Sequence, residues 1–222
     1  KDEFSQYAEG ESGHLRIFAN TTAVSDFMPD VLASFLETRP GVTVDLQERL
    51  THDIIRGVTD GSTDLGVVAG PVNSNKKLEV IPFSVDRLVV VTARKHPLAT
   101  RQTLSFRETL EYPHIGLREG STLFNFLKEQ ASDIGLPLQM RIQVFGFESA
   151  CRMVSRGVGI SILPQSIALR YADFLNISTI DLEDAWAERE RSLIVRELDA
   201  LPKCGKELVE EIRSQISLTT LA

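Results

Sequence analysis

The sequence predicts an α/β fold built from two similar units, and three features support this prediction. The first third of the chain reads as strand, helix, strand, helix and strand, which is the order of a parallel sheet with right-handed crossovers. Residues 64–69 form a compact apolar run typical of a parallel strand covered on both faces. A second strand, polar turn and helix begins at His114 and repeats the opening pattern in kind.

The fold is expected to begin at His14, because residues 1–13 are polar, have no period and read as the end of a linker. The short apolar strand Leu15–Ala19 then leads into the polar turn Asn20–Ser25. A helix start offers unpaired backbone N–H donors, so hydroxyl and amide side chains in this turn would form a small site for an anion or polar ligand.

A long amphipathic helix is predicted after the turn, because apolar pairs recur every four residues from Phe27 onward. Pro29 fits only in the first turn of this helix, and Pro40 ends it. The simpler interpretation of Ser25 or Asp26 is that one of them caps this helix.

Alternation, capping residues and glycine stops predict the other elements of the first unit. They are a strand at 42–48, a helix at 53–60 capped by Thr51, a strand at 64–69, and two adjacent strands at 78–83 and 87–93. Charge and proline in residues 94–99 then mark the exit from this unit.

The same signals predict the elements of the second unit and a return to the first. They are a helix at 106–110, a strand at 114–117, a helix opened by the turn 118–122 and stopped by Gly135, a strand at 140–145, a helix at 148–156, a strand at 159–164, a helix at 165–172 and a strand at 175–182. A long strand at 186–198 is expected to cross back to the first unit, and an amphipathic helix at 206–218 closes the chain.

Composition excludes several functional classes. The 24 basic and 31 acidic residues give a net charge of −7, which argues against this chain gripping nucleic acid by itself. Cys151 and Cys204 are far apart and offer neither a disulfide framework nor metal-ligand spacing, so a reduced, cytoplasmic setting is expected. No stretch is apolar enough to span a bilayer, residues 1–4 are not a signal peptide, and the missing initial Met indicates a fragment.

Catalytic and cofactor motifs are missing from the sequence, which predicts no enzyme activity, no cofactor and no metal. There is no G-x-S-x-G elbow and no phosphate-binding Walker loop. Gly157 and Gly159 lack the third glycine of a dinucleotide fingerprint. The histidines do not form a pair at metal-ligand spacing; they are His14, His52, His96 and His114.

Five motifs in order make the chain resemble the effector-binding domain of LysR-type transcriptional regulators. They are Leu15-Arg16-Ile17 before a helix with Pro29, the turn and strand 39–44, a "G-x-x-D-L-a-i" element at 61–67, "HPLA" at 96–99 and a "G-x-G-I-x-x-L-P" element at 157–164. That family has a fold like type 2 periplasmic solute-binding proteins. Its N-terminal winged helix-turn-helix is absent from these residues, which assigns DNA binding to a part of the protein outside this chain.

The resemblance implies two Rossmann-like lobes joined by two crossover strands, with a small effector, expected to be anionic, bound in the cleft between them. Lobe one would comprise residues 14–94 with 189–222, and lobe two residues 95–188. The resemblance also implies a homodimer of these domains, arranged side by side in opposite directions, and no membrane partner.

Candidate effector-binding residues come from loops at the carboxyl ends of predicted strands, where open α/β sheets bind ligands. They are Asn20, Thr21, Thr22, Ser25, Thr51, His52, Arg118, Ser121 and Phe147. Several also have a purely structural interpretation.

Thr21 and Thr22 are favoured as ligand donors. Thr51 is equally a helix cap or a ligand contact, and His52 is favoured as a solvent-facing side chain over one that lines the cleft. Arg118 would hold an anion in a bidentate fork or simply be solvated, and Ser121 is matched to Ser25. The remaining two residues also have alternatives: Phe147 is either a lid or a core aromatic, and Cys151 is most simply a buried hydrophobe, because a redox sensor would need a resolving thiol or a polarised thiolate.

Two functions compete with that of a ligand-sensing regulator domain. A solute-binding protein that feeds a transporter shares the expected fold, although the missing export signal speaks against it. A module that only assembles subunits would bind no small molecule at all.

Overall fold

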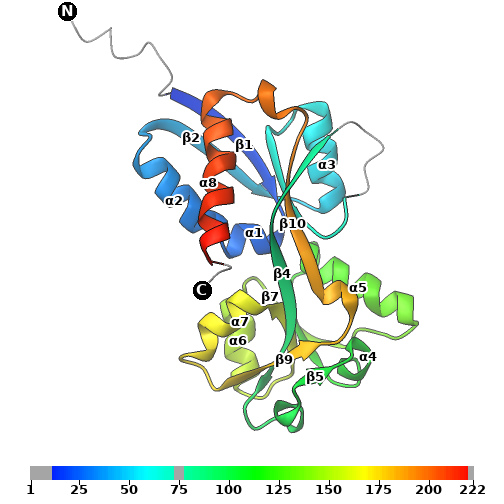
Figure 1. Ribbon diagram of the computed structural model, residues 1–222. Coiled ribbons are helices and arrows are strands. Elements are labelled where there is room, and N and C mark those ends of the chain that lie inside the picture. The colour runs from blue at the N-terminus through cyan, green and yellow to red at the C-terminus, as the bar shows by residue number, and fades with distance from the viewer. Residues whose placement is uncertain (1–11, 73–77, 220–222) are drawn as a thin grey trace, which may run out of the picture. The chain divides into compact units, whose positions relative to one another are not determined.

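The computed structural model describes residues 12–72 and 78–219, with side chains described only up to Ser214 (Figure 1). The chain divides into two compact units. The first comprises the residues up to Val85 and those from Glu190 onward, and the second comprises Asp86–Arg189. Both boundaries fall inside strands, β4 (Glu79–Ala93) and β10 (Glu188–Val195), so two strands run from one unit into the other.

The first unit is built on the strand order β2-β1-β3-β10-β4. β1 (Ser12–Ala19) pairs in parallel with β2 (Gly41–Glu48) and with β3 (Leu65–Ala69), as the sequence predicts. β10 is antiparallel to β3, with Arg191 opposite Ala69. The parallel strands end at the same edge of the sheet, where β1 leads into Asn20 and β2 into Arg49.

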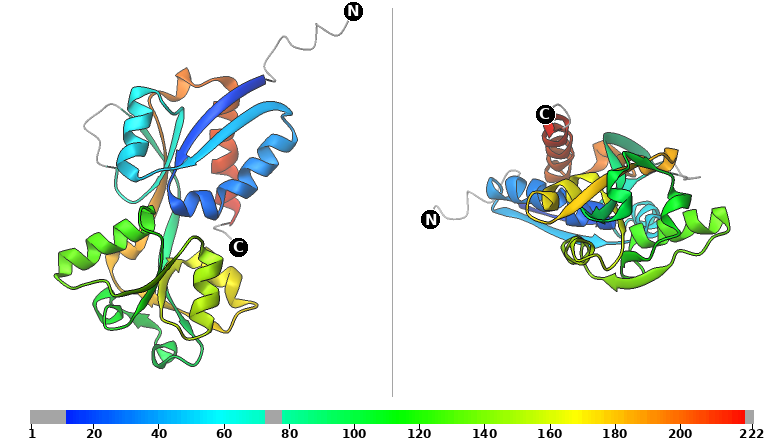
Figure 2. Two further views of the ribbon diagram at one scale, coloured as in Figure 1. Left: turned by 180° about the vertical axis from the view of Figure 1, so that it is seen from behind. Right: turned by 90° about the horizontal axis from the view of Figure 1, so that it is seen from below.

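Helices cover both faces of this sheet (Figures 1 and 2). α2 (Met28–Glu37) and α8 (Lys203–Thr219) lie on one face, and α3 (Thr51–Asp60) lies on the other. The α3 face is closely packed, because a Cβ added at Gly66 would lie only 2.6 Å from Ile54 Cγ2. Glycine in β3 therefore lets α3 approach the strand directly.

The second unit holds the other strands and two further layers of helices. Its strands are the ends of β4 and β10 together with β5 (Thr103–Leu104), β6 (His114–Leu117), β7 (Met140–Val144), β8 (Ser161–Pro164) and β9 (Ile177–Leu182). β4 pairs with β8 and β9, β5 pairs with β9, and β6 pairs in parallel with β7. The helices of this unit and the short 3-10 turns of the chain are α4 (Phe106–Thr109), α5 (Thr122–Ile134), α6 (Phe147–Ser155), α7 (Gln165–Ala172), η1 (Pro97–Thr100), η2 (Ala185–Ala187) and η3 (Leu198–Ala200, in the first unit).

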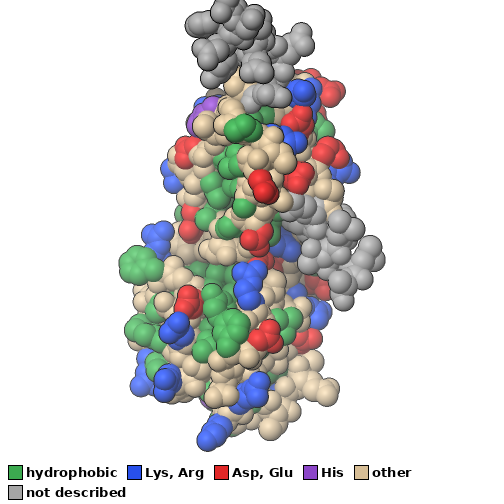
Figure 3. Space-filling view, turned by 90° about the vertical axis from the view of Figure 1, so that its left-hand side faces the viewer, with side chains coloured by type: hydrophobic (Ala, Val, Ile, Leu, Met, Phe, Trp, Pro, Cys, Tyr) green, Lys and Arg blue, Asp and Glu red, His purple; other side chains and the backbone are tan. Residues whose placement is uncertain are grey.

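α6 and α7 lie on one side of the second unit and α5 on the other (Figures 1 and 2). On the face that carries α6 and α7, hydrophobic side chains are interspersed with lysine and arginine (Figure 3). Leu169 and Phe174 are exposed there, at 51% and 68% of their surface. Each unit has its own apolar core, with Ile17, Phe35 and Leu208 in the first and Phe106 and Ile162 in the second.

The predicted single helix after β1 is in fact two helices, α1 (Thr21–Ser25) and α2. Neither Ser25 nor Asp26 stands at an N-cap position, because the N-cap of α1 is Asn20, whose Oδ1 accepts from Ala23 N at 2.9 Å, and the N-cap of α2 is Phe27. Pro29 lacks an N–H and fits only a first turn, so the chain begins a new helix there. The capping interpretation therefore missed the short helix α1.

Three other element predictions are corrected. The predicted fold start at His14 is two residues late, because Ser12 and Gly13 already belong to β1; the rest of the predicted linker lies outside the described residues. Thr51 does not cap α3 but is its first residue, after Leu50, which makes no side-chain cap. The long strand expected at 186–198 is shorter, since η2 precedes β10.

The two strands predicted at 78–83 and 87–93 are a single strand, β4. The residues between the two predicted strands include Asp86, and a lone carboxylate is costly inside a sheet. In the structure it forms an ion pair with Arg189 of β10, and the two side chains are only 3% and 8% exposed. A residue 103 positions away therefore removes the reason for a break.

Candidate functional site

Six of the predicted site residues lie in the first unit, at the ends of β1 and β2. Asn20 follows β1 directly, and its backbone N donates to Val67 O of β3 at 3.1 Å. The Asn20 side chain caps α1, so this turn is tied to the sheet on one side and to the helix on the other. Thr21 and Thr22 are buried, at 5% and 2% exposure, while Ser25 is exposed.

The hydroxyl of Thr21 is engaged by a carboxylate. Thr21 Oγ1 donates to Glu48 Oε1 at 2.7 Å, and Glu48 is the last residue of β2. Glu48 is not among the candidate site residues predicted above, because scattered acids usually lie on solvated faces, although its position at the carboxyl end of a predicted strand is the signal that finds the other candidates. This half of the candidate site therefore carries a negative charge beside its hydroxyl.

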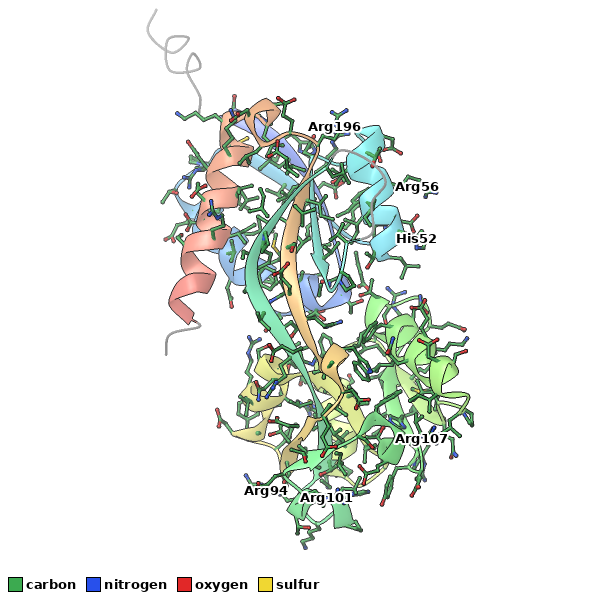
Figure 4. The ribbon with its side chains drawn as sticks, turned by 45° about the vertical axis from the view of Figure 1, so that its right-hand side comes forward. His52, Arg56, Arg94, Arg101, Arg107 and Arg196 are labelled. Atoms are coloured by element: carbon green, nitrogen blue, oxygen red, sulfur yellow. The ribbon has the colours of Figure 1, made fainter. Side chains whose placement is uncertain are left out.

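The start of α3 supplies the other two candidates of the first unit. Thr51 is half-buried as the first residue of α3. The His52 side chain is 71% exposed and its Nε2 lies 3.4 Å from the Asp53 carboxylate. Figure 4 shows His52 and Arg56 projecting from α3 on the side away from the sheet. The solvent-facing interpretation of His52 fits this position.

A buried charge pair lies directly after α1. Asp26 Oδ2 is 3.8 Å from Arg191 Nη1, and their side chains are 5% and 13% exposed. Arg191 Cζ also lies 4.9 Å from the ring centroid of Phe27, and its Nη2 donates to Val85 O. These contacts join the α1–α2 junction to β10 and β4 within the first unit.

The other three candidates lie in the second unit, at the ends of β6 and β7. The backbone N of Arg118 donates to Val144 O at 2.9 Å, which holds the ends of these two strands together. Ser121 is 2% exposed and caps α5, because its Oγ accepts from Phe124 N at 3.2 Å. Ser121 therefore corresponds in role to Asn20, and its predicted match to Ser25 is wrong.

The aromatic residues near this turn have opposite environments. Phe147 is 4% exposed and belongs to the apolar core of the second unit, which agrees with its interpretation as a core aromatic. Phe145 is 90% exposed, and the guanidinium carbon of Arg118 lies 5.9 Å from its ring centroid. The exposed aromatic of this turn is thus Phe145.

Cys151 behaves as a buried hydrophobe. It lies in the core of the second unit, and burial raises the pKa of its thiol to about 11. A thiol with a raised pKa is protonated at neutral pH and is a poor nucleophile. Within residues 12–72 and 78–219, no three His, Cys, Asp or Glu side chains gather where they could hold a metal ion. None of the described helices is long and apolar enough to cross a membrane.

Comparison with known proteins gives consistent matches along the chain. A family model described as "LysR substrate binding domain" matches residues 8–217. YwbI of Bacillus subtilis (strain 168), named as an uncharacterized HTH-type transcriptional regulator, is 29% identical over 208 residues, which cover 94% of this chain and 68% of YwbI. The HTH-type transcriptional regulator CysL of the same organism is 25% identical, over 82% of this chain and 60% of CysL.

Solved structures share the fold. The regulatory domain of Synechocystis CcmR, in complex with 2-PG, superposes with a TM-score of 0.75 at 21% identity, covering 92% of this chain and 98% of that one. The effector binding domain of QuiR, in complex with shikimate, superposes with a TM-score of 0.67 at 20% identity, covering 93% of this chain and 98% of the QuiR domain. Among curated regulators, the chain spans 68% of the length of YwbI, 60% of CysL and 55% of YbhD of Escherichia coli (strain K12). The relatives support the regulator interpretation and not the transporter alternative.

Proposed function

This chain belongs to the LysR substrate-binding domain family, and from that premise we propose that it is the effector-binding domain of a transcriptional regulator. The protein would sense a small metabolite and pass the signal to DNA-binding segments outside these residues. Binding, and not catalysis, is the proposed role. A ligand can change the arrangement of subunits only through different affinities for two arrangements.

The observation that carries the proposal is the turn at Arg118–Ser121. It presents an exposed guanidinium beside the capped N-terminus of a helix of 13 residues, α5. The first N–H groups of such a helix have no intrahelical acceptors, and the macrodipole favours negative charge there. A carboxylate or another small anion is therefore the ligand group that we assign to this half of the site.

The proposal takes the turn after β1 as the second half of the same site. Asn20, Thr21, Thr22, Ser25, Thr51 and His52 would contact the remainder of the effector. Because Glu48 already accepts from Thr21, we expect this half to receive a hydroxyl or amine of the effector and not a second anionic group. The shikimate bound by QuiR and the 2-PG bound by CcmR are small molecules of the size that such a site would take.

The predicted lobes one and two would correspond to the two compact units, with the effector between them. Phe147 would support the second half from the core, and Phe145 would be its aromatic contact. We further propose that the domain forms homodimers and that the full-length protein acts in the cytoplasm, where its DNA lies.

A thermal-shift screen of small hydroxylated carboxylates tests the proposal. A ligand present at about one hundred times its dissociation constant should stabilise the chain by about 2.7 kcal/mol. Arg118→Ala should weaken the binding of any hit at least about tenfold, which corresponds to one lost charged hydrogen bond. The matched control is Arg107→Ala, because Arg107 is an exposed arginine on α4 of the same unit (Figure 4). Hits that bind both variants equally well would place the site elsewhere.

A further inference from the structure

His114 presents a buried acceptor that the proposed effector site does not use. Its side chain is 2% exposed, and Nδ1 lies 2.9 Å from the carbonyl oxygen of Tyr112. A carbonyl only accepts, so Nδ1 carries the proton and Nε2 carries a lone pair. Among the described residues Nε2 has no hydrogen-bond partner. Burial also lowers the pKa of His114 to about 4, so the ring is neutral near pH 7.

A small cavity lies beside this histidine, between β6 and α5. Its volume is about 10 Å³, and apart from His114 its walls are apolar. They include Leu117, Leu123, Leu127 and Ile162. A buried water needs two to four polar partners, and His114 supplies a single ring nitrogen. A water is therefore a poor partner for Nε2, and a molecule that is apolar apart from one donor group suits the cavity better.

An open groove of about 440 Å³ adjoins the cavity on the same unit. Phe124, Leu138 and Met140 line both spaces, so these three residues are shared by the cavity and the groove. The groove continues along α5 to Gly135, with Lys128 at its edge. Its volume lies within the range of small-molecule sites.

Met140 is the most adaptable of these three side chains. A Cβ added at Gly116 of β6 would lie 2.2 Å from Met140 Cε, so the end of the Met140 side chain occupies the space over Gly116. Methionine has an unbranched, adaptable side chain and repacks around irregular shapes more readily than leucine or phenylalanine. A shift of Met140 would join the groove to the cavity beside His114.

We propose that groove and cavity together bind a small aromatic molecule that carries one hydrogen-bond donor, such as a phenol. The ring would take the place of the Met140 side chain among the apolar walls, and its O–H would donate to His114 Nε2. A carboxylate is excluded from this role, because an apolar site opposes a buried charge and a neutral Nε2 gives it no proton.

This site is separate from the proposed effector site and does not depend on it. His114 begins β6, whereas Arg118 and Ser121 follow the end of the same strand. The groove follows α5 toward its C-terminus, away from the capped start.

Phenol and anisole form a matched pair of probes, because anisole keeps the ring and oxygen but has no O–H. With chain labelled with ¹⁵N in histidine, we expect saturable phenol binding that shifts the His114 Nε2 resonance. Anisole should bind about five- to tenfold more weakly, as one net hydrogen bond implies. Equal affinity for the two probes, an unmoved His114 resonance, or no saturable binding would each overturn the proposal.

Two variants test the hydrogen-bond acceptor and the groove separately. His114→Phe should lower phenol affinity to that of anisole while leaving anisole affinity unchanged. Leu138→Trp should fill the groove and weaken both probes, whereas the control Leu169→Trp, on the exposed side of α7, should weaken neither. If His114→Phe fails to fold, probe binding to Leu138→Trp and the His114 Nε2 resonance of the unmutated chain still test the proposal. Phenol binding that survives Leu138→Trp unchanged would also overturn the proposal.

Discussion

The two strand–turn–helix segments that follow β1 and β6 look alike in sequence but differ in the structure. After β1, Asn20 caps a helix of five residues, and the neighbouring Thr21 hydroxyl is bound to Glu48. After β6, Ser121 caps a helix of 13 residues, and Arg118 is exposed. A polar turn between a strand and a helix therefore fixes neither the charge of a site nor the number of aligned backbone dipoles behind it.

The difference indicates that the two turns bind different groups of a ligand. A long helix with an exposed guanidinium at its start favours an anion, because cation and macrodipole act in the same direction. A short helix beside a carboxylate favours a donor group. Variants in both units, together with unfolding in acid, test this contrast.

Phe147, the first residue of α6, lies in the core of the second unit, and removing its ring should give the largest loss of stability. Phe147→Ala should lower the free energy of unfolding by about 3–5 kcal/mol, because it empties a core position. Phe145→Ala, two residues earlier and exposed, should change it by less than about 0.5 kcal/mol. Urea unfolding of both variants measures the difference. Similar losses would show that Phe145 is also held by packing.

Acid should weaken the two units in different pH windows. Burial lowers the pKa of His114 to about 4, whereas an unfolded histidine titrates near 6.5. As the pH falls, the unfolded chain binds this proton before the folded chain does. The contribution of His114 to the free energy of unfolding is therefore fully present above about pH 6.5, and up to roughly 3 kcal/mol of it is lost by pH 4. His114→Phe should therefore show a flatter free energy of unfolding across this window.

In the first unit the corresponding group is Asp64. Burial opposes its ionisation, but the hydrogen bonds from Arg16 outweigh burial and keep the pKa of Asp64 below its usual value. Its contribution is present above the unfolded pKa and is lost as the pH falls through the lower folded one. Acid unfolding of Asp64→Asn, compared with that of His114→Phe, measures the pH range over which each residue's contribution to stability is lost. Identical pH profiles would contradict the assignment.

Both capping residues should stabilise the chain by similar, smaller amounts. Asn20→Ala and Ser121→Ala each remove a side-chain acceptor for a helix N–H group and should cost about 1 kcal/mol. Ser25→Ala is the control, because Ser25 caps nothing and is exposed. Thermal unfolding with and without a ligand compares the three. A loss at Ser25 equal to that at Asn20 would contradict the observed cap.

The smallest stability effect is expected at Arg118. Its side chain is exposed, so Arg118→Ala should change the free energy of unfolding by less than about 0.5 kcal/mol in the absence of ligand. The same variant is expected to weaken an anionic effector. If Arg118→Ala lowers the free energy of unfolding by more than about 1 kcal/mol without ligand, Arg118 is a structural residue.

The sequence by itself determined the order of the elements and several of their ends. Gly135 ends α5 in the left-handed conformation with φ 74°, and Ser121 begins the same helix as the polar turn indicated. The parallel pairing of β1 with β2 and β3 also follows from local signals. Such features depend on residues a few positions apart, whose preferences for dihedral angles and burial can be read directly.

Only the tertiary structure decided the contacts between residues that are distant in sequence, at the candidate site and elsewhere. Thr21 is bound by Glu48, 27 residues away, and Asp86 is paired with Arg189 across 103 residues. Which of Phe145 and Phe147 is buried depends on how β7 and α6 pack, not on either residue's own preference. The cost of burying a charge, a ring nitrogen or a hydroxyl depends on the partner that packing brings to it, and that partner is distant in sequence.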